Sequence, residues 1–177
     1  MVAVKQDLAG RLMAVQNNYV LGLASIALLS ADEVMPFLRT QSASFGQYSV
    51  TFDQVAELLA KPAAREESVK QFLIMLMCSM TKDTFELTRH HCKVAGRLQE
   101  MQAQPWFQFA RLVRNCIAHN FLFEFKSYDR TLLPVTWKGC TITAAMDHQE
   151  LPLAVFGFVQ AWELFAEFRA FAAQTGV

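Results

Sequence analysis

Arginine, asparagine and histidine side chains interrupt the otherwise apolar stretch RLVRNCIAHN, residues 111–120. The guanidinium group of an arginine can hold a phosphate through two parallel hydrogen bonds. The imidazole of a histidine titrates near neutral pH, so it can act as a general acid or a general base. The candidate residues are Arg111, Arg114, Asn115 and His119. Their types therefore indicate a site that binds phosphate and transfers a proton.

The sequence predicts that these residues lie on one α-helix, which follows Pro105 and runs from residue 106 to about 124. On a helix that turns by about 100° per residue, the apolar side chains fall on a single core face, which includes Leu112, Val113, Cys116 and Ile117. The four polar residues form a stripe on the opposite face. Cys116 therefore lies away from His119, which argues against a nucleophilic Cys/His pair. Asn120 alone falls on the core face, so either the helix loosens there or its amide meets a buried partner.

The spacing within the stripe favours a composite site. Asn115 and His119 are four residues apart, so their side chains can touch, and Arg111 and Arg114 are likewise neighbours. Arg114 and His119, in contrast, are about 140° apart around an ideal helix. Their functional groups can meet only where the long arginine side chain bends over the stripe or where a second chain completes the site.

The run of Arg114, Asn115, three further residues and His119 resembles the signature of the HEPN superfamily. In that signature an arginine, usually followed by a polar residue, precedes a histidine by a few positions. Members are compact bundles of four or five helices that dimerise, and many are metal-independent ribonucleases of toxin, phage-defence and RNA-processing systems. The resemblance implies a homodimer in which two copies of the motif face each other and form one RNA-cleaving site. It implies no cofactor, and for a toxin it implies an antitoxin protein as a partner.

By the same resemblance, Arg114 stabilises the phosphate, His119 handles the proton and Asn115 orients the site, while Arg111 can add a contact to the substrate phosphate. RNA carries its own nucleophile, the 2′-hydroxyl, so this chemistry needs a base of near-neutral pKa and a cation but no metal. The products are a 2′,3′-cyclic phosphate and a 5′-hydroxyl. HEPN toxins that are silenced by adenylylation carry a tyrosine two residues beyond the histidine. This sequence has Phe121 there, so that control is not expected.

Two interpretations without catalysis stay open. The stripe could belong to a helical dimer that binds a nucleotide or a protein partner, or it could be a solvated helix face with no site. The 16 basic and 16 acidic residues give no broad basic field for nucleic acid, so any RNA-binding role must rest on a local site. The run RHHC, residues 89–92, is not expected to bind metal, because adjacent histidines on a helix diverge by about 100°.

The composition predicts a packed, mainly α protein, because 53% of the 177 residues are apolar and only 7 are Gly and 5 Pro. We expect a single HEPN-like helical domain over residues 1–177, built as an up-and-down bundle of four to five helices with a small β-hairpin inserted before the last helix. Helices are expected at residues 5–30, 53–61, 63–100, 106–124 and 153–173. The connector, residues 31–51, is expected to hold at most a short turn of helix.

Residues 63–100 are predicted to form one long helix or two nearly collinear ones, because this range contains no proline and no glycine before Gly96. The first half contains FLIMLMCSM, which is apolar all round and is expected at the domain centre. The second half is more polar and is expected to run out to a surface. Its residues Glu86 and Arg89 belong to a polar face that could lie against the motif helix.

A β-hairpin is predicted at about residues 130–143, because LLPVTW and CTIT are β-prone and Lys138-Gly139 suits a tight turn. Pro134 fits only an edge or the start of a strand. The last helix carries more aromatic side chains than one core-facing stripe can hold. Part of its surface is therefore expected to pack on a second copy of the chain.

The cysteines and the N-terminal segment favour a cytoplasmic protein. Four cysteines lie far apart with no secretory leader ahead of them, so reduced thiols are expected. The most apolar N-terminal run, YVLGLASIALLS, has 12 residues, which are too few to span a bilayer. No membrane association is therefore expected.

Overall fold

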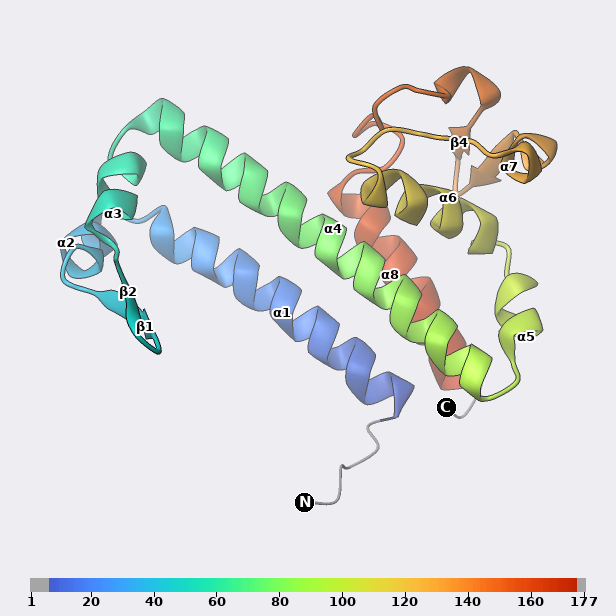
Figure 1. Ribbon diagram of the computed structural model, residues 1–177, viewed down its shortest axis with the longest axis horizontal. Helices are drawn as coiled ribbons and strands as arrows, with labels where there is room; N and C mark the ends of the chain where they lie inside the picture. Colours follow the sequence, from blue (N-terminus) through green and yellow to red (C-terminus); the bar gives the residue numbers. More distant parts are fainter. Residues whose placement is uncertain (1–6, 175–177) are drawn as a thin grey trace. The chain divides into compact units, whose positions relative to one another are not determined.

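The computed structural model describes residues 7–174 (Figure 1). It is mainly α, with a small hairpin before the last helix, which confirms the predicted fold class. Its eight α-helices in this range are α1 (Leu8–Leu29), α2 (Met35–Leu38), α3 (Asp53–Leu59), α4 (Pro62–Val94), α5 (Leu98–Gln102), α6 (Phe107–Ala118), α7 (Ser127–Leu132) and α8 (Phe158–Gln174). The strands are β1 (Ser42–Phe45), β2 (Tyr48–Thr51), β3 (Val135–Trp137) and β4 (Cys140–Ile142). Only α1, α4, α6 and α8 have 12 residues or more, in keeping with the four to five helices expected.

The chain forms two compact units. The middle unit comprises residues 17–76, and the main unit combines residues 7–16 with residues 77–174 of the described chain. The motif helix α6 belongs to the main unit. The expectation of a single domain over residues 1–177 stays a prediction.

A β-hairpin that the sequence interpretation missed lies in the middle unit. Strands β1 and β2 pair antiparallel across the two-residue turn Gly46-Gln47, with Gly46 at a φ of 60°. Residues 31–51 were expected to be a connector with a short turn of helix; α2 supplies that turn, but the prediction did not include the hairpin. The signal was present, because Ala43 and Phe45 alternate with serines and pair with Val50 and Tyr48 across the turn.

The two long helices of the middle unit approach each other closely. A side-chain carbon added at Gly22 of α1 would lie 2.5 Å from the side chain of Leu76 in α4, so a larger residue there requires the Leu76 side chain to move. A small core of Met35, Ala56 and Leu59 completes the unit, with Leu29 and Leu38 packed against it.

The core of the main unit is largely aromatic. Phe85 of α4 stacks on Phe107 of α6 with ring centroids 5.9 Å apart, and it meets Phe168 of α8 edge-on at 6.2 Å. Trp106 lies 4.2 Å from the same Phe168 ring. These contacts fasten helices α4, α6 and α8 together, because aromatic pairs bury large areas in defined orientations.

The buried face of α4 lies in its second half, which corrects the expectation that this half runs out to a surface. Its buried residues are Met77, Met80, Thr81, Thr84, Phe85, Thr88 and Cys92, spaced at threes and fours. Three threonines supply part of this face, and the Thr81 hydroxyl donates a hydrogen bond to the Met77 carbonyl at 2.8 Å. The all-apolar stretch FLIMLMCSM, residues 72–80, is only partly buried: it contributes Met77 and Met80 to this face, whereas Met75 is 56% exposed.

Helix α4 ends where Gly96 adopts a φ of 70°, in the left-handed region. The amide of Arg97 then donates to the Cys92 carbonyl at 2.7 Å, which satisfies one of the last carbonyls of the helix. The chain turns there into the separate short helix α5. The predicted helix over residues 63–100 is therefore one long helix to Val94 followed by a break.

The hairpin β3–β4 occupies the predicted position. Lys138 and Gly139 form its turn with φ values of 46° and 80°, as a type I′ turn requires. Trp137 is buried, and its ring lies 5.2 Å from that of Phe109 in α6. The hairpin therefore packs against the apolar face of the motif helix.

Helix α1 matches the helix predicted at residues 5–30, and its apolar stretch is longer than the 12-residue run considered in the sequence. Among the described residues, it is the one helix whose length and composition would allow it to cross a membrane, with a mean hydropathy of 1.5 in an 18-residue window that is 17% buried. The flanking residues Gln16, Asn17 and Asn18 continue the helix without adding charge. Core helices of soluble proteins and signal sequences share these properties.

Candidate functional site

Helix α6 presents the predicted core face. Phe107, Phe109, Ala110, Leu112, Val113 and Cys116 are buried. The helix ends at Ala118, and not near residue 124, because Asn120 and Phe121 have φ values of 56° and 65°. Asparagine tolerates the left-handed region better than most residues. Asn120 is exposed beyond the helix end, so of the two explanations considered for it, the loosened helix is the one observed.

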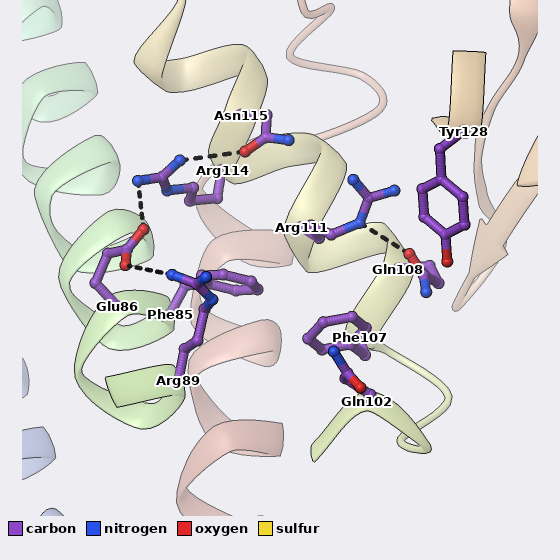
Figure 2. A pocket seen from close by; sticks show the side chains of 10 residues that line it. All are labelled: Phe85, Glu86, Arg89, Gln102, Phe107, Gln108, Arg111, Arg114, Asn115 and Tyr128. Carbon is purple, nitrogen blue, oxygen red and sulfur yellow. Dashed lines mark hydrogen bonds and ion pairs between the residues drawn. The ribbon is translucent and has the colours of Figure 1, made fainter. Parts of the chain in front are cut away.

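Three of the four candidate residues line one pocket. Arg111, Arg114 and Asn115 of α6 meet side chains from α4, α5 and α7 around a cavity of about 430 Å³ (Figure 2). The other lining residues are Phe85, Glu86, Arg89, Gln102, Phe107, Gln108 and Tyr128. All of them belong to the main unit.

Arg114 is held at one end of the pocket by Glu86 and Asn115. Its Nη2 forms a close ion pair with the Glu86 carboxylate, and its Nη1 donates to Asn115 Oδ1 at 3.2 Å. The second oxygen of Glu86 lies 3.7 Å from Nη1 of Arg89 (Figure 2). The predicted contact between the polar face of α4 and the motif helix is thereby confirmed. The Asn115 side chain, however, bonds Arg114, and the hydrogen bond between Asn115 and His119 is a backbone one, from the His119 amide to the Asn115 carbonyl at 3.0 Å.

Arg111 is held by a different set of partners. Its Nη1 lies 2.7 Å from Asp129 Oδ1, and its Nε donates to Gln108 Oε1 at 2.9 Å. The guanidinium carbon lies 5.4 Å from the centre of the Tyr128 ring, within the range of a cation–π contact. Asp129 is buried and also accepts a hydrogen bond from the Lys126 amide at 2.9 Å. Sequence reasoning missed Tyr128 and Asp129, because only the turn into α7 brings them beside α6.

Both arginines keep unused hydrogen-bonding capacity. Within the described chain, Nη2 of Arg111 and Nε of Arg114 are buried and have no hydrogen-bond acceptor. A buried donor without a partner costs about 1–3 kcal/mol, so such groups are uncommon unless they serve a ligand or strain the site. Both guanidinium groups line the pocket, and each keeps one buried N–H without an acceptor in the described chain.

His119 stands apart from this pocket. It caps the C-terminal end of α6 with a φ of −105°, its side chain is 49% exposed, and it is not among the lining residues. Its Nδ1 lies 3.4 Å from Glu124 Oε2 in the segment that follows the helix. The structure therefore brings Arg111, Arg114 and Asn115 together and leaves His119 outside the group.

The cysteines do not offer a nucleophile. Burial raises the pKa of Cys78 to about 11 and that of Cys116 to about 12, so both thiols stay protonated near neutral pH. Cys116 lies on the apolar side of α6, as predicted. Within residues 7–174, no three His, Cys, Asp or Glu side chains gather as a metal-binding group would.

The chain matches no protein-family model, no curated protein and no solved structure. The chemistry of the pocket itself must therefore carry any functional assignment.

Proposed function

We propose that this protein is a metal-independent endoribonuclease of the HEPN type that contacts the RNA backbone through Arg111 and Arg114. The observation that supports the proposal most directly is the shared pocket, in which both guanidinium groups keep a buried N–H without an acceptor in the described chain. The planar guanidinium group binds two oxygens of a phosphate through parallel hydrogen bonds, and a partly buried site strengthens the attraction.

Each residue of the motif has a role in the proposed reaction. Arg114 stabilises the negative charge that develops on phosphorus, and Asn115 fixes the direction of its guanidinium through the 3.2 Å hydrogen bond. Arg111 contributes a second contact to the RNA backbone. His119 transfers a proton to or from the 2′-hydroxyl or the leaving 5′-oxygen, since imidazole exchanges protons near neutral pH.

The position of His119 makes the proposed site a composite of two chains. His119 is exposed and lies outside the pocket of its own chain. A catalytic imidazole must come within hydrogen-bond reach of the reacting oxygen. We propose that a homodimer brings His119 of one copy to the arginine pocket of the other.

A ribonuclease assay in the presence of EDTA tests this function. We expect the wild type to cleave RNA and leave 2′,3′-cyclic phosphate ends, and His119→Ala and Arg114→Ala to slow cleavage by roughly 10²-fold or more. His148→Ala is the matched control, because His148 lies in a loop and its side chain is 76% exposed. Full activity of His119→Ala, or no cleavage of a broad RNA panel by the wild type, would contradict the proposal.

One observation favours a second function, a non-catalytic dimer that binds a nucleotide or a protein partner through the same pocket. No histidine lines the pocket, and His119 faces Glu124 instead. For this function, labelled RNA or nucleotide should bind the wild type and His119→Ala equally, fail to bind Arg114→Ala, and stay uncleaved. Cleavage that depends on His119 excludes it.

We further propose a cytoplasmic location, because all four cysteines are free thiols. A role in a toxin–antitoxin or phage-defence system, with an antitoxin protein as partner, rests on the resemblance of the motif alone. Expression of the wild type should slow bacterial growth more than expression of His119→Ala at equal protein levels.

A further inference from the structure

The pocket has two ends of different chemistry. Figure 2 shows Glu86, Arg89, Arg114 and Asn115 grouped at one end, where charged side chains dominate. The other end holds the rings of Phe107 and Tyr128, the side-chain amides of Gln102 and Gln108, and the Arg111 guanidinium, which lies between Gln108 and Tyr128. A ligand that fills both ends must carry an anionic group and a flat group with hydrogen-bonding edges.

At the charged end, one carboxylate pairs with two guanidinium groups. Glu86 pairs closely with Arg114 through one oxygen and lies 3.7 Å from Arg89 through the other. Glu86 is thus located where an anion would bind both guanidinium groups. A phosphate can take over this position, because it offers more acceptor oxygens than a carboxylate and binds guanidinium groups through two parallel hydrogen bonds.

At the other end, an aromatic ring is available for stacking. Tyr128 is 59% exposed, and the Arg111 guanidinium lies near one of its faces at 5.4 Å. Bases stack on such rings whatever their sequence, since every base has a π-face. The amides of Gln102 and Gln108 supply both donors and acceptors, which suit the edges of a base.

The size of the pocket excludes phosphate as its whole ligand. A cavity of about 430 Å³ lies within the range of small-molecule sites, and a phosphate group fills only a small part of it. A sugar and a base are needed to occupy the remainder. Of phosphate-bearing ligands, a nucleotide combines the anionic group and the flat group that the two ends require.

We propose that the pocket binds one nucleotide of the RNA, with its phosphate between Arg89 and Arg114 in place of the Glu86 carboxylate and its base against Tyr128. That this nucleotide is part of an RNA chain rests on the proposed function. The assignment makes Glu86 a competitor of the phosphate, and it makes Tyr128 the residue that distinguishes a nucleotide from a sugar phosphate.

Calorimetric titration of the full chain with adenosine 5′-monophosphate and with ribose 5-phosphate tests the assignment. We expect the nucleotide to bind about tenfold more tightly than the sugar phosphate, and Tyr128→Ala to abolish this difference. Glu86→Gln should tighten the binding of both ligands by about tenfold, since it keeps the side-chain shape and removes the competing charge. Glu100→Gln is the matched control, because Glu100 pairs with Arg97 outside the pocket, and it should change neither affinity.

Equal affinity for the two ligands would show that only phosphate is held and would overturn the nucleotide assignment. Weaker binding by a folded Glu86→Gln would overturn the exchange of carboxylate for phosphate. The outcomes are distinct from those of the cleavage assay. If Tyr128→Ala leaves EDTA-resistant cleavage intact, the proposed ribonuclease stands and the proposed nucleotide site is wrong. If the protein binds the nucleotide but does not cleave RNA, the nucleotide site stands and the proposed ribonuclease is wrong.

Discussion

At the scale of single residues, the pair of Arg111 and Asp129 determines how firmly the pocket is held. Asp129 is buried with an exposure of 4%, and its carboxylate is shared by the Arg111 guanidinium and the Lys126 amide. Replacing one partner of such a pair leaves the other charge in a poorly hydrated place.

We therefore expect Asp129→Asn to lower the free energy of unfolding by about 2 kcal/mol and to weaken nucleotide binding. Denaturant titration monitored by circular dichroism measures the first effect. Glu167→Gln is the control, because the Glu167 pair with Lys138 is more exposed and should contribute less than about 0.5 kcal/mol. Equal stability of Asp129→Asn and the wild type would show that Arg111 needs no fixed partner.

Asp147 makes the segment after α6 sensitive to acid. Its carboxylate accepts hydrogen bonds from the Phe125 amide at 3.0 Å and from Arg130, and these contacts lower its pKa below the ordinary 3.8. Because its pKa is lowered on folding, the Asp147 carboxylate contributes fully to the free energy of unfolding above pH 3.8. This contribution is lost as the pH falls through the pKa of Asp147 in the folded protein. Between pH 6 and about pH 2, the difference in Tm between the wild type and Asp147→Asn should shrink towards zero. A difference that stays constant over this range would contradict the assignment.

The residues of the site were predictable to different degrees. The helical repeat was enough to place Arg111, Arg114 and Asn115 on one face, because they lie within about one helical turn of each other. It could not predict that Asn115 bonds Arg114, since that choice depends on Glu86 drawing the guanidinium towards α4. Gln102 and Tyr128 come from α5 and α7, and no local pattern relates them to α6.

At the scale of elements, the end of α6 decides where His119 lies. The helix stops at Ala118, and Asn120 adopts a φ of 56° in the left-handed region. A β-branched residue there should cost about 1–2 kcal/mol, whereas glycine is accepted without strain. We expect Asn120→Val to lower the unfolding free energy by that amount and Asn120→Gly to leave it nearly unchanged. Urea unfolding of the two variants measures the difference, and equal values would mean that the turn relaxes.

The elements also show why hydrophobic pattern alone misplaced part of the core. Helix α4 buries Thr81, Thr84 and Thr88 with Phe85, and threonine presents a methyl group to the core while its hydroxyl can bond the helix backbone. A simple count of apolar residues therefore favoured the wrong half of the helix. The hairpin β3–β4 was found because Lys138-Gly139 carries a local turn signal that needs no tertiary context.

At the scale of the whole molecule, the middle unit exposes an uncharged apolar surface. Residues 17–30 of the α1 segment and 71–79 of α4 contain no charged side chain. Leu21 and Leu28 are 66% and 62% exposed, and Met75 is 56% exposed. Contiguous apolar surfaces of this kind usually mark an interaction site, and the proposed composite site requires a second copy of the chain.

We expect the protein to be a dimer by light scattering at micromolar concentration, and the double variant Leu21→Glu/Leu28→Glu to raise the dissociation constant at least about tenfold. Gln47→Glu is the control, because it adds a negative charge to an exposed hairpin turn of the same unit. A monomeric wild type would contradict the composite site, since His119 then has no second pocket to reach. If the wild type is found in the membrane fraction and only detergent releases it, the apolar surface of α1 contacts lipid instead of a second copy. This helix has the length and hydropathy to span a bilayer.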